Sequence, residues 1–137
     1  MNDSEKMEAV RQMFTAWEAR DWDGIIARFA GNGTLHSMMS DPVTGHEALQ
    51  ELFAGFKDSI EALTIDIEYL GVIEGAVISV RTDRVTVNGR QGALPTVGLI
   101  LYDDDGKIEL WREYFDRATL LSEMGVDKDW IQETNGD

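Results

Sequence analysis

The sequence predicts a single α+β domain in which three N-terminal helices pack on a strongly curved, mixed or antiparallel sheet. Apolar residues recur at helical spacing before residue 60, and after it they alternate with polar residues as strands require. Helices followed by a meander of long strands are typical of α+β domains. Because helices would close one side of the curved sheet, we expect a cone whose apolar interior holds a small molecule.

Three segments before residue 60 have the pattern of amphipathic helices. The first follows residues 2–4, which can cap it, and the second follows Asp21, another capping residue. The third follows Thr44, where Glu47 three residues later fits a capping box. Each segment has one apolar stripe, so we expect all three helices to pack on the sheet.

Five segments have the pattern of strands, and turn signals separate the later ones. Asn88-Gly89 predicts a tight hairpin turn because both residues tolerate positive φ. Residues 103–106, three aspartates and a glycine, predict the next turn. The expected strands cover residues 34–39, 60–72, 76–87, 91–102 and 107–115. We expect a helix over residues 117–124 and a C-terminal tail over 125–137, with a helical turn at 127–132.

The charge of the chain limits its partners. It has 26 Asp and Glu residues against 12 Lys and Arg residues, which gives a formal net charge of −14. Such a surface repels nucleic acid, anionic lipid and anionic substrates. No apolar run approaches the roughly 18 residues of a membrane-spanning helix. We therefore expect a neutral, apolar small-molecule ligand and neither a nucleic-acid nor a membrane partner.

Residue types that hold metals or disulfides are scarce. There is no cysteine, so disulfides and thiolate chemistry are absent, and a reducing compartment is favoured. His36 and His46 have no clustered partners, so we expect neither a metal nor a cofactor. The polar, acidic residues 1–6 differ from the basic and then apolar layout of a signal peptide. These features together predict a cytoplasmic protein.

A pair of opposite charges interrupts the β-branched strand over residues 76–87. Arg81 and Asp83 are two positions apart, so a strand places both on the face that also carries Val85. Asp116, at the end of the last expected strand, would complete an Asp–Arg–Asp group. The alternative interpretation of Arg81 and Asp83 is a structural ion pair, which is common on strand faces.

The order of elements resembles the NTF2-like superfamily, which contains ketosteroid isomerases, SnoaL-type polyketide cyclases and limonene-1,2-epoxide hydrolases. The resemblance is closest to the limonene-1,2-epoxide hydrolases and extends over about residues 5–122. Their signature pairs an Arg-x-Asp with a later Trp-Arg-[Asp/Glu]-Tyr-Phe-Asp. Here the two motifs read Arg81-Thr82-Asp83 and Trp111-Arg112-Glu113-Tyr114-Phe115-Asp116. The resemblance implies the NTF2-like cone and a single such domain over residues 1–137.

The resemblance also implies site residues. Asp116 would be the general base that activates water, Asp83 would protonate the epoxide oxygen, and Arg81 would bridge the two. The family holds its water with a Tyr-x-Asn on the first strand, where the aligned residues here are His36 and Met38. A histidine can still hold a water, whereas a methionine lacks the donor and acceptor of an asparagine.

The physical chemistry of two acids and one arginine agrees with such a reaction. One carboxyl must be ionised and the other protonated, and burial beside a second acid and a shared arginine favours that division. We therefore expect a cofactor-independent epoxide hydrolase. An isomerase or polyketide-cyclase-like enzyme that moves a proton is the alternative, with Tyr114, His36 or protonated Asp83 as the oxyanion donor. A non-catalytic module that binds a small apolar ligand is the third possibility.

The strand over residues 91–102 has apolar residues on both faces. Alternation places Val97, Leu99 and Leu101 on one face and Leu94, Thr96 and Ile100 on the other. Both faces need cover, so we expect a homodimer. We expect these residues, or their alternation partners, to line a mostly apolar pocket: Leu35, Met38, Phe53, Val85 and Leu99.

Overall fold

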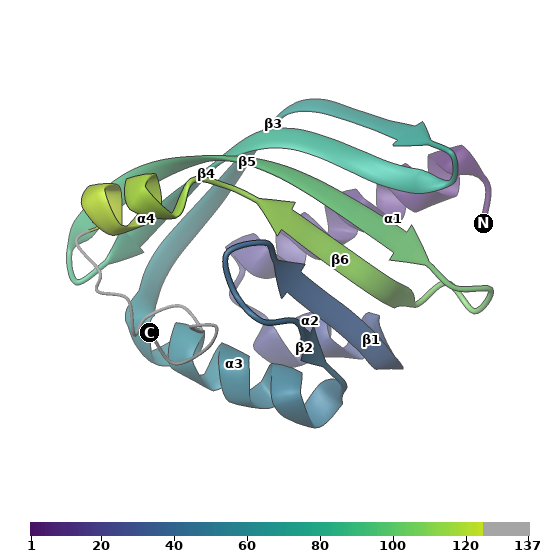
Figure 1. The fold of residues 1–137 in the computed structure, drawn as a ribbon, viewed down its shortest axis with the longest axis horizontal. Coiled ribbons are helices and arrows are strands. Elements are labelled where there is room, and N and C mark those ends of the chain that lie inside the picture. The colour runs from purple at the N-terminus through teal and green to yellow at the C-terminus, as the bar shows by residue number, and fades with distance from the viewer. Residues whose placement is uncertain (125–137) are drawn as a thin grey trace.

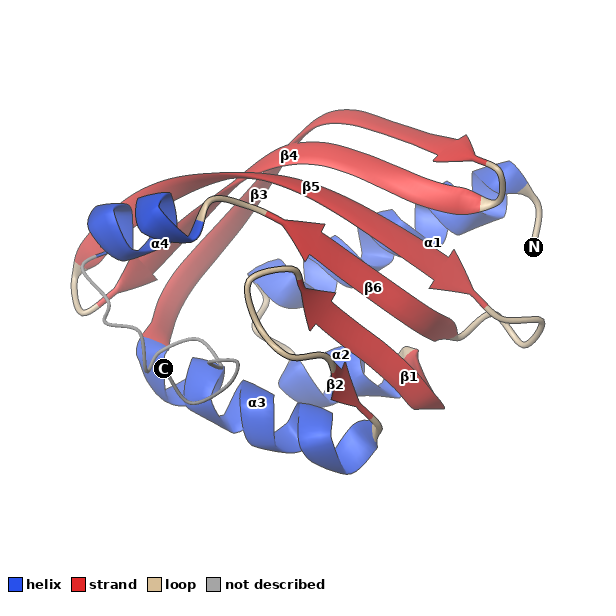
Figure 2. Cartoon of the chain, viewed as in Figure 1, coloured by secondary structure: helices blue, strands red, loops and turns tan. Residues whose placement is uncertain are grey.

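A computed structural model describes residues 1–124 of the chain as an open, curved sheet with helices against it (Figures 1 and 2). The helices are α1 (Asp3–Glu18), α2 (Trp22–Ala27), α3 (His46–Ser59) and α4 (Arg117–Met124). The strands are β1 (Phe29–Ser37), β2 (Val43–Thr44), β3 (Ile60–Ile73), β4 (Ala76–Val87), β5 (Arg90–Tyr102) and β6 (Ile108–Tyr114). None of the described helices has the length and apolar character needed to span a membrane.

The six strands form one mixed sheet in the order β2-β1-β6-β5-β4-β3. The neighbours are antiparallel except β1 and β6, which run parallel. In Figure 1 the long strands arch over α1, α2 and α3, while α4 lies at one end of the sheet. One face of the sheet therefore packs on these helices, and the other face is turned away from them.

The mixed α+β class and the curved sheet agree with the sequence prediction. The detail of three helices packed on the sheet is not confirmed, because residues 1–124 contain four helices, the fourth being the helix expected over residues 117–124. The expected break at residues 31–33 lies inside β1, where the register with β6 shifts between Phe29 and Thr34. The expected tail and its helical turn lie outside the described residues.

The helix starts follow the sequence signals in two of three cases. Asn2 and Glu5 form a capping box at α1, and the Asp21 side chain accepts a hydrogen bond from the Gly24 amide at α2. The capping box expected at Thr44 does not form, because Thr44 belongs to β2 and its hydroxyl bonds that of Thr34. Gly45, at φ 92°, precedes α3 instead, a conformation that suits glycine.

The core lies between the helices and the inner face of the sheet. Trp111 of β6 is its centre, with Phe14, Trp17 and Phe29 around the indole at ring distances of 5.8–6.1 Å. A second, smaller cluster joins the ends of β3, β4 and β5 to α4 through Ile60, Val85, Val87, Leu94 and Leu120. Apolar side chains of both clusters lie around Arg81 and Asp83, the charged residues on the inner face of β4.

Candidate functional site

The site begins with the inner face of β4. Because side chains alternate along a strand, Ser79, Arg81, Asp83 and Val85 all point to the same side, toward the helices. Arg81 is 2% exposed, and Arg81, Asp83 and Val85 line a cavity in the interior. The prediction that Arg81 and Asp83 share one largely apolar face is confirmed.

The Arg81 guanidinium is bound on all its edges. Its Nε and Nη2 donate to the two Asp83 oxygens at 2.9 and 3.2 Å, and Nη1 donates to Ser79 Oγ at 3.0 Å. Nη2 also donates to Oε1 of Glu113 on β6. The ring of Phe14 from α1 lies 4.8 Å from the guanidinium carbon. Arg81 is therefore held rigidly between two carboxylates.

Glu113 reaches Arg81 from two strands away in the sheet. It pairs with Gly98 of β5 on one side and with Ser37 of β1 on the other. Its side chain is 16% exposed, equal to that of Asp83, and both carboxyls line the cavity. The site is thus an Asp83–Arg81–Glu113 group, a carboxyl–guanidinium–carboxyl bridge across three strands.

Burial dominates the electrostatics of both acids. It raises the pKa of Glu113, against the opposing effect of Arg81, and the nearby Asp83 raises it further. It also raises the pKa of Asp83, which Arg81 lowers and Asp66 of β3 raises. For Arg81 burial acts to lower the pKa, but the two carboxylates outweigh it and raise that pKa above its ordinary value. One cation facing two such acids favours a single proton held between them.

A cavity of about 160 Å³ opens beside this group. Its wall is mostly apolar, with the two acids, Arg81, Ser37, Ser40 and Asp41 as the polar members. The apolar lining comprises Trp17, Leu35, Val43, Leu52, Phe56, Ile60, Leu63, Ile65, Val85, Leu94, Trp111, Phe115 and Leu120. Among residues 1–124 no three His, Asp or Glu side chains are grouped so as to hold a metal ion.

Comparison with known proteins identifies the family of this fold. The family model of the SnoaL-like domain matches residues 10–111, which is most of the chain. The chain belongs to the SnoaL-like domain family. The resemblance expected from the sequence is thereby confirmed at the level of this family.

Solved structures agree on the fold of this SnoaL-like domain. An LEH-like epoxide hydrolase of M. tuberculosis superposes with a TM-score of 0.77 at 22% identity, covering 89% of this chain and 90% of that chain. A protein of ketosteroid isomerase-like fold from Catenulispora acidiphila, in complex with trimethylamine, gives 0.76 at 20% identity, covering 89% and 95%. SalBIII, an epoxide hydrolase/cyclase-like enzyme in pyran ring formation in polyether salinomycin, gives 0.76 at 20%, covering 85% and 94%.

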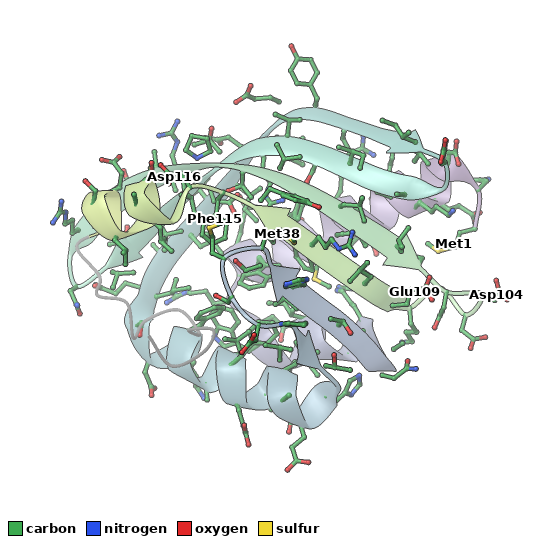
Figure 3. All side chains as sticks on the ribbon, viewed as in Figure 1. Met1, Met38, Asp104, Glu109, Phe115 and Asp116 are labelled. Carbon is green, nitrogen blue, oxygen red and sulfur yellow. The ribbon has the colours of Figure 1, made fainter. Side chains whose placement is uncertain are left out.

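Asp116 does not contact Arg81 in the structure. The predicted Asp–Arg–Asp group is therefore wrong in its third residue, because Glu113 and not Asp116 binds Arg81. Asp116 is exposed and caps α4, accepting hydrogen bonds from the Ala118 amide at 3.1 Å and the Thr119 hydroxyl at 2.7 Å. Figure 3 shows it at the start of α4. Trp111 and Glu113 alternate onto the inner face of β6 while Arg112 and Tyr114 do not, and the strand ends at Tyr114, before Asp116.

The two residues aligned with the water-holding pair also lie away from the cavity. His36 is the cross-strand partner of Arg112, on the face of β1 opposite the lining residues Leu35 and Ser37. Met38 is 39% exposed on the loop after β1 (Figure 3). Successive residues of a strand point to opposite faces, so His36 points away from the cavity while its neighbours Leu35 and Ser37 point toward it. Ser37 is the polar β1 side chain that reaches the cavity.

The predicted pocket is partly confirmed. The cavity is mostly apolar, and Leu35 and Val85 line it as expected. Phe53 lies in the solid core at 1% exposure, and Leu99 points to the outer face while Leu94 lines the cavity. Glu113 was missed, although alternation from the buried Trp111 places it on the inner face. Ser37 could have been found in the same way from Leu35.

Proposed function

We propose that this protein adds water to the epoxide of a small apolar molecule in one acid–base step, with Glu113 as general base and Asp83 as general acid. The observation that supports it is the Arg81 guanidinium bound by both carboxylates in the wall of one cavity. An epoxide needs a base on the attacking water and an acid on the ring oxygen. A pair of acids that holds one proton supplies both.

The proposed reaction balances without a cofactor. A water oxygen forms a bond to an epoxide carbon while Glu113 takes one proton from that water. The carbon–oxygen bond of the ring breaks, and Asp83 gives its proton to the released oxygen. The product is a vicinal diol, with Glu113 protonated and Asp83 ionised. Transfer of that proton from Glu113 back to Asp83 restores the starting state, and Arg81 stabilises the ionised partner throughout.

The surroundings of Glu113 favour it as the base. Ser37 is its cross-strand partner on β1, and both line the cavity. The Ser37 oxygen accepts a weak hydrogen bond from the Met39 amide at 3.4 Å, which leaves its hydroxyl proton free to hold the attacking water. Asp83 lies on β4 beside Arg81, and β5 and β6 separate that strand from β1, so we assign Asp83 to the epoxide oxygen.

The cavity favours a neutral, apolar substrate. Most of its wall is hydrocarbon, and the polar groups gather around the acids and the loop after β1. The net charge of −14 disfavours anionic molecules. A neighbour in fold is described as an LEH-like epoxide hydrolase, and another as epoxide hydrolase/cyclase-like, which supports this reaction class.

An epoxide-opening cyclase is the second candidate, because Ser37 is the only residue of β1 that supplies a polar side chain to the described cavity wall. A hydroxyl group of the substrate itself could then take the place of water. The isomerase alternative is less well supported. Two of its three expected oxyanion donors, His36 and Tyr114, point to the outer face of the sheet, which leaves Asp83.

A substrate panel separates these reactions. The purified protein is incubated in ¹⁸O-labelled water with apolar epoxides, hydroxy-epoxides and conjugated ketones, and products are identified by mass spectrometry. Labelled diols support the hydrolase, and unlabelled cyclic ethers support the cyclase. Migrated double bonds support the isomerase, and saturable ligand binding without any product supports a binding module and contradicts the enzyme proposals.

A further inference from the structure

Gly98 of β5 lies directly beneath the Arg81–Glu113 contact. It is the cross-strand partner of Ser79 on β4 and of Glu113 on β6, so the bridge between those strands passes over it. A Cβ placed on Gly98 would lie 2.6 Å from Arg81 Nη1, 2.6 Å from Glu113 Oε2 and 3.0 Å from Ser79 Oγ. Two of these separations are shorter than real Cβ atoms show, so a side chain at position 98 would force the neighbouring side-chain atoms to shift.

A glycine is needed at position 98 because there is no free space for a side chain, and not because the backbone there has an unusual conformation. Its φ lies outside the left-handed region, in which Gly45, Gly75, Gly89 and Gly106 are found. An alanine could therefore adopt the same backbone, but its methyl group would displace whatever lies above it. The atoms that it would meet are the ends of three side chains, and Arg81 among them has little room to move because Ser79, Asp83 and Glu113 hold it.

One oxygen of Glu113 lies next to this position and out of contact with water. Oε2 is fully buried and has no hydrogen-bond partner within ordinary limits among residues 1–124, and it lies against the Gly98 backbone. Burial of an unpaired carboxyl oxygen disfavours the ionised form. A side chain at position 98 would push this oxygen away from the strand and from Arg81.

We propose that Gly98 is a positioning residue for the acid pair: its missing side chain lets Glu113 and Arg81 meet over β5, so that Glu113 and Asp83 share one proton. This inference rests on the proposed function for its effect on the rate, but its effect on the proton can be measured without any substrate. The charged and titratable groups around the pair are Arg81, Asp66 on β3 and Asp41 on the loop that lines the cavity. The Trp111 indole on β6 also acts on Glu113 and lowers its pKa.

The first test is Gly98→Ala, with the Asp83 and Glu113 carboxyl carbons followed by ¹³C NMR through a pH titration. We expect the pKa of Asp83 to fall, because Glu113 moves away and Asp83 keeps Arg81 to itself. If the panel yields a substrate, we also expect kcat to fall at least tenfold with a displaced pH profile. A lost rate with unchanged titration would contradict the inference, whereas a displaced titration without any known substrate would leave it standing.

Gly71→Ala is the matched control. Gly71 is also a strand glycine, on β3, and a Cβ there would meet no atom within 4 Å. We expect this variant to keep the titration and the rate of the parent protein. Equal effects of the two substitutions would mean that loss of a strand glycine, and not the contact with Glu113, is responsible.

A second substitution tests the route of the effect. Glu113→Asp shortens the side chain by one methylene. In the double variant with Gly98→Ala, the shorter carboxyl side chain leaves room for the alanine methyl group. We expect the double variant to recover the coupled titration, and at least part of the folding stability if Gly98→Ala alone unfolds the protein. A double variant no better than Gly98→Ala would overturn the proposal, because the methyl group would then act elsewhere.

Discussion

Glu113 and Ser37 are cross-strand partners in the parallel pair β6–β1, and both face the cavity in which Glu113 binds Arg81. Through this pair the Asp83–Arg81–Glu113 group lies next to β1, whose Ser37 hydroxyl can hold a water molecule. We expect Ser37→Ala to lower kcat for an epoxide about tenfold with a smaller change in KM, since it removes the hydroxyl and little else. His36→Ala is the control, because His36 faces away from the cavity. Equal losses in the two variants would remove Ser37 from the reaction.

Arg81 should contribute strongly to stability at neutral pH. Arg81→Met removes the cation shared by two buried carboxyls, and breaking a buried ion group typically costs about 3–5 kcal/mol. Arg81→Lys keeps the charge but cannot bind Ser79, Asp83 and Glu113 together, so we expect an intermediate loss. Denaturant unfolding at pH 7 measures both. An Arg81→Met protein as stable as its parent would contradict this account of the site.

The raised pKa values of Asp83 and Glu113 give stability a pH dependence of defined sign. Above their ordinary values of 3.8 and 4.5, the unfolded chain releases protons that the folded site still holds. The unfolding free energy should therefore fall as pH rises through this window, by up to about 1.4 kcal/mol per pH unit for each proton. Glu113→Gln should flatten the curve relative to the parent protein. Parallel curves for the two proteins would mean that Glu113 takes no part in holding such a proton.

The outer face of the sheet presents a row of apolar cross-strand neighbours, and we propose that a second copy of the chain covers it. Tyr69, Val80, Val97 and Tyr114 are consecutive partners across β3, β4, β5 and β6. Of these, Tyr69 is 72%, Val97 39% and Tyr114 42% exposed. Light scattering should show a homodimer at micromolar concentrations, and Val97→Glu should dissociate it. Since each copy carries −14, added salt should strengthen the dimer. A monomer at all salt concentrations would contradict this proposal.

Local patterns were sufficient to predict most strands and the Arg81–Asp83 pair. Alternation places Arg81 and Asp83 on one face whatever the neighbouring strands are, and Asn88-Gly89 fixes the β4–β5 turn. β2 was missed because two residues carry no periodicity. The start of β1 was missed because glycines normally break a strand, whereas Gly33 passes close to the Ile108 carbonyl of β6.

The second acid of the group and the water-holding residue depend on the pairing of distant strands, which the sequence alone does not show. That Glu113 reaches Arg81 depends on the strand order β6-β5-β4, which alternation along one strand does not give. Whether Ser37 or His36 faces the cavity is decided by the register of β1 on β6. The role of Gly98 needs three strands at once, because neither Ser79 nor Glu113 is near it in the sequence.

The most direct test compares Glu113→Gln with Asp116→Asn on whichever epoxide the panel reveals. We expect Glu113→Gln to lower kcat by at least about 10²-fold, the usual contribution of a general base. We expect Asp116→Asn to keep nearly full activity, since Asp116 caps α4 outside the cavity and asparagine is also a good capping residue. Full diol formation by Glu113→Gln, with loss of activity in Asp116→Asn, would contradict the assignment of Glu113 as the base.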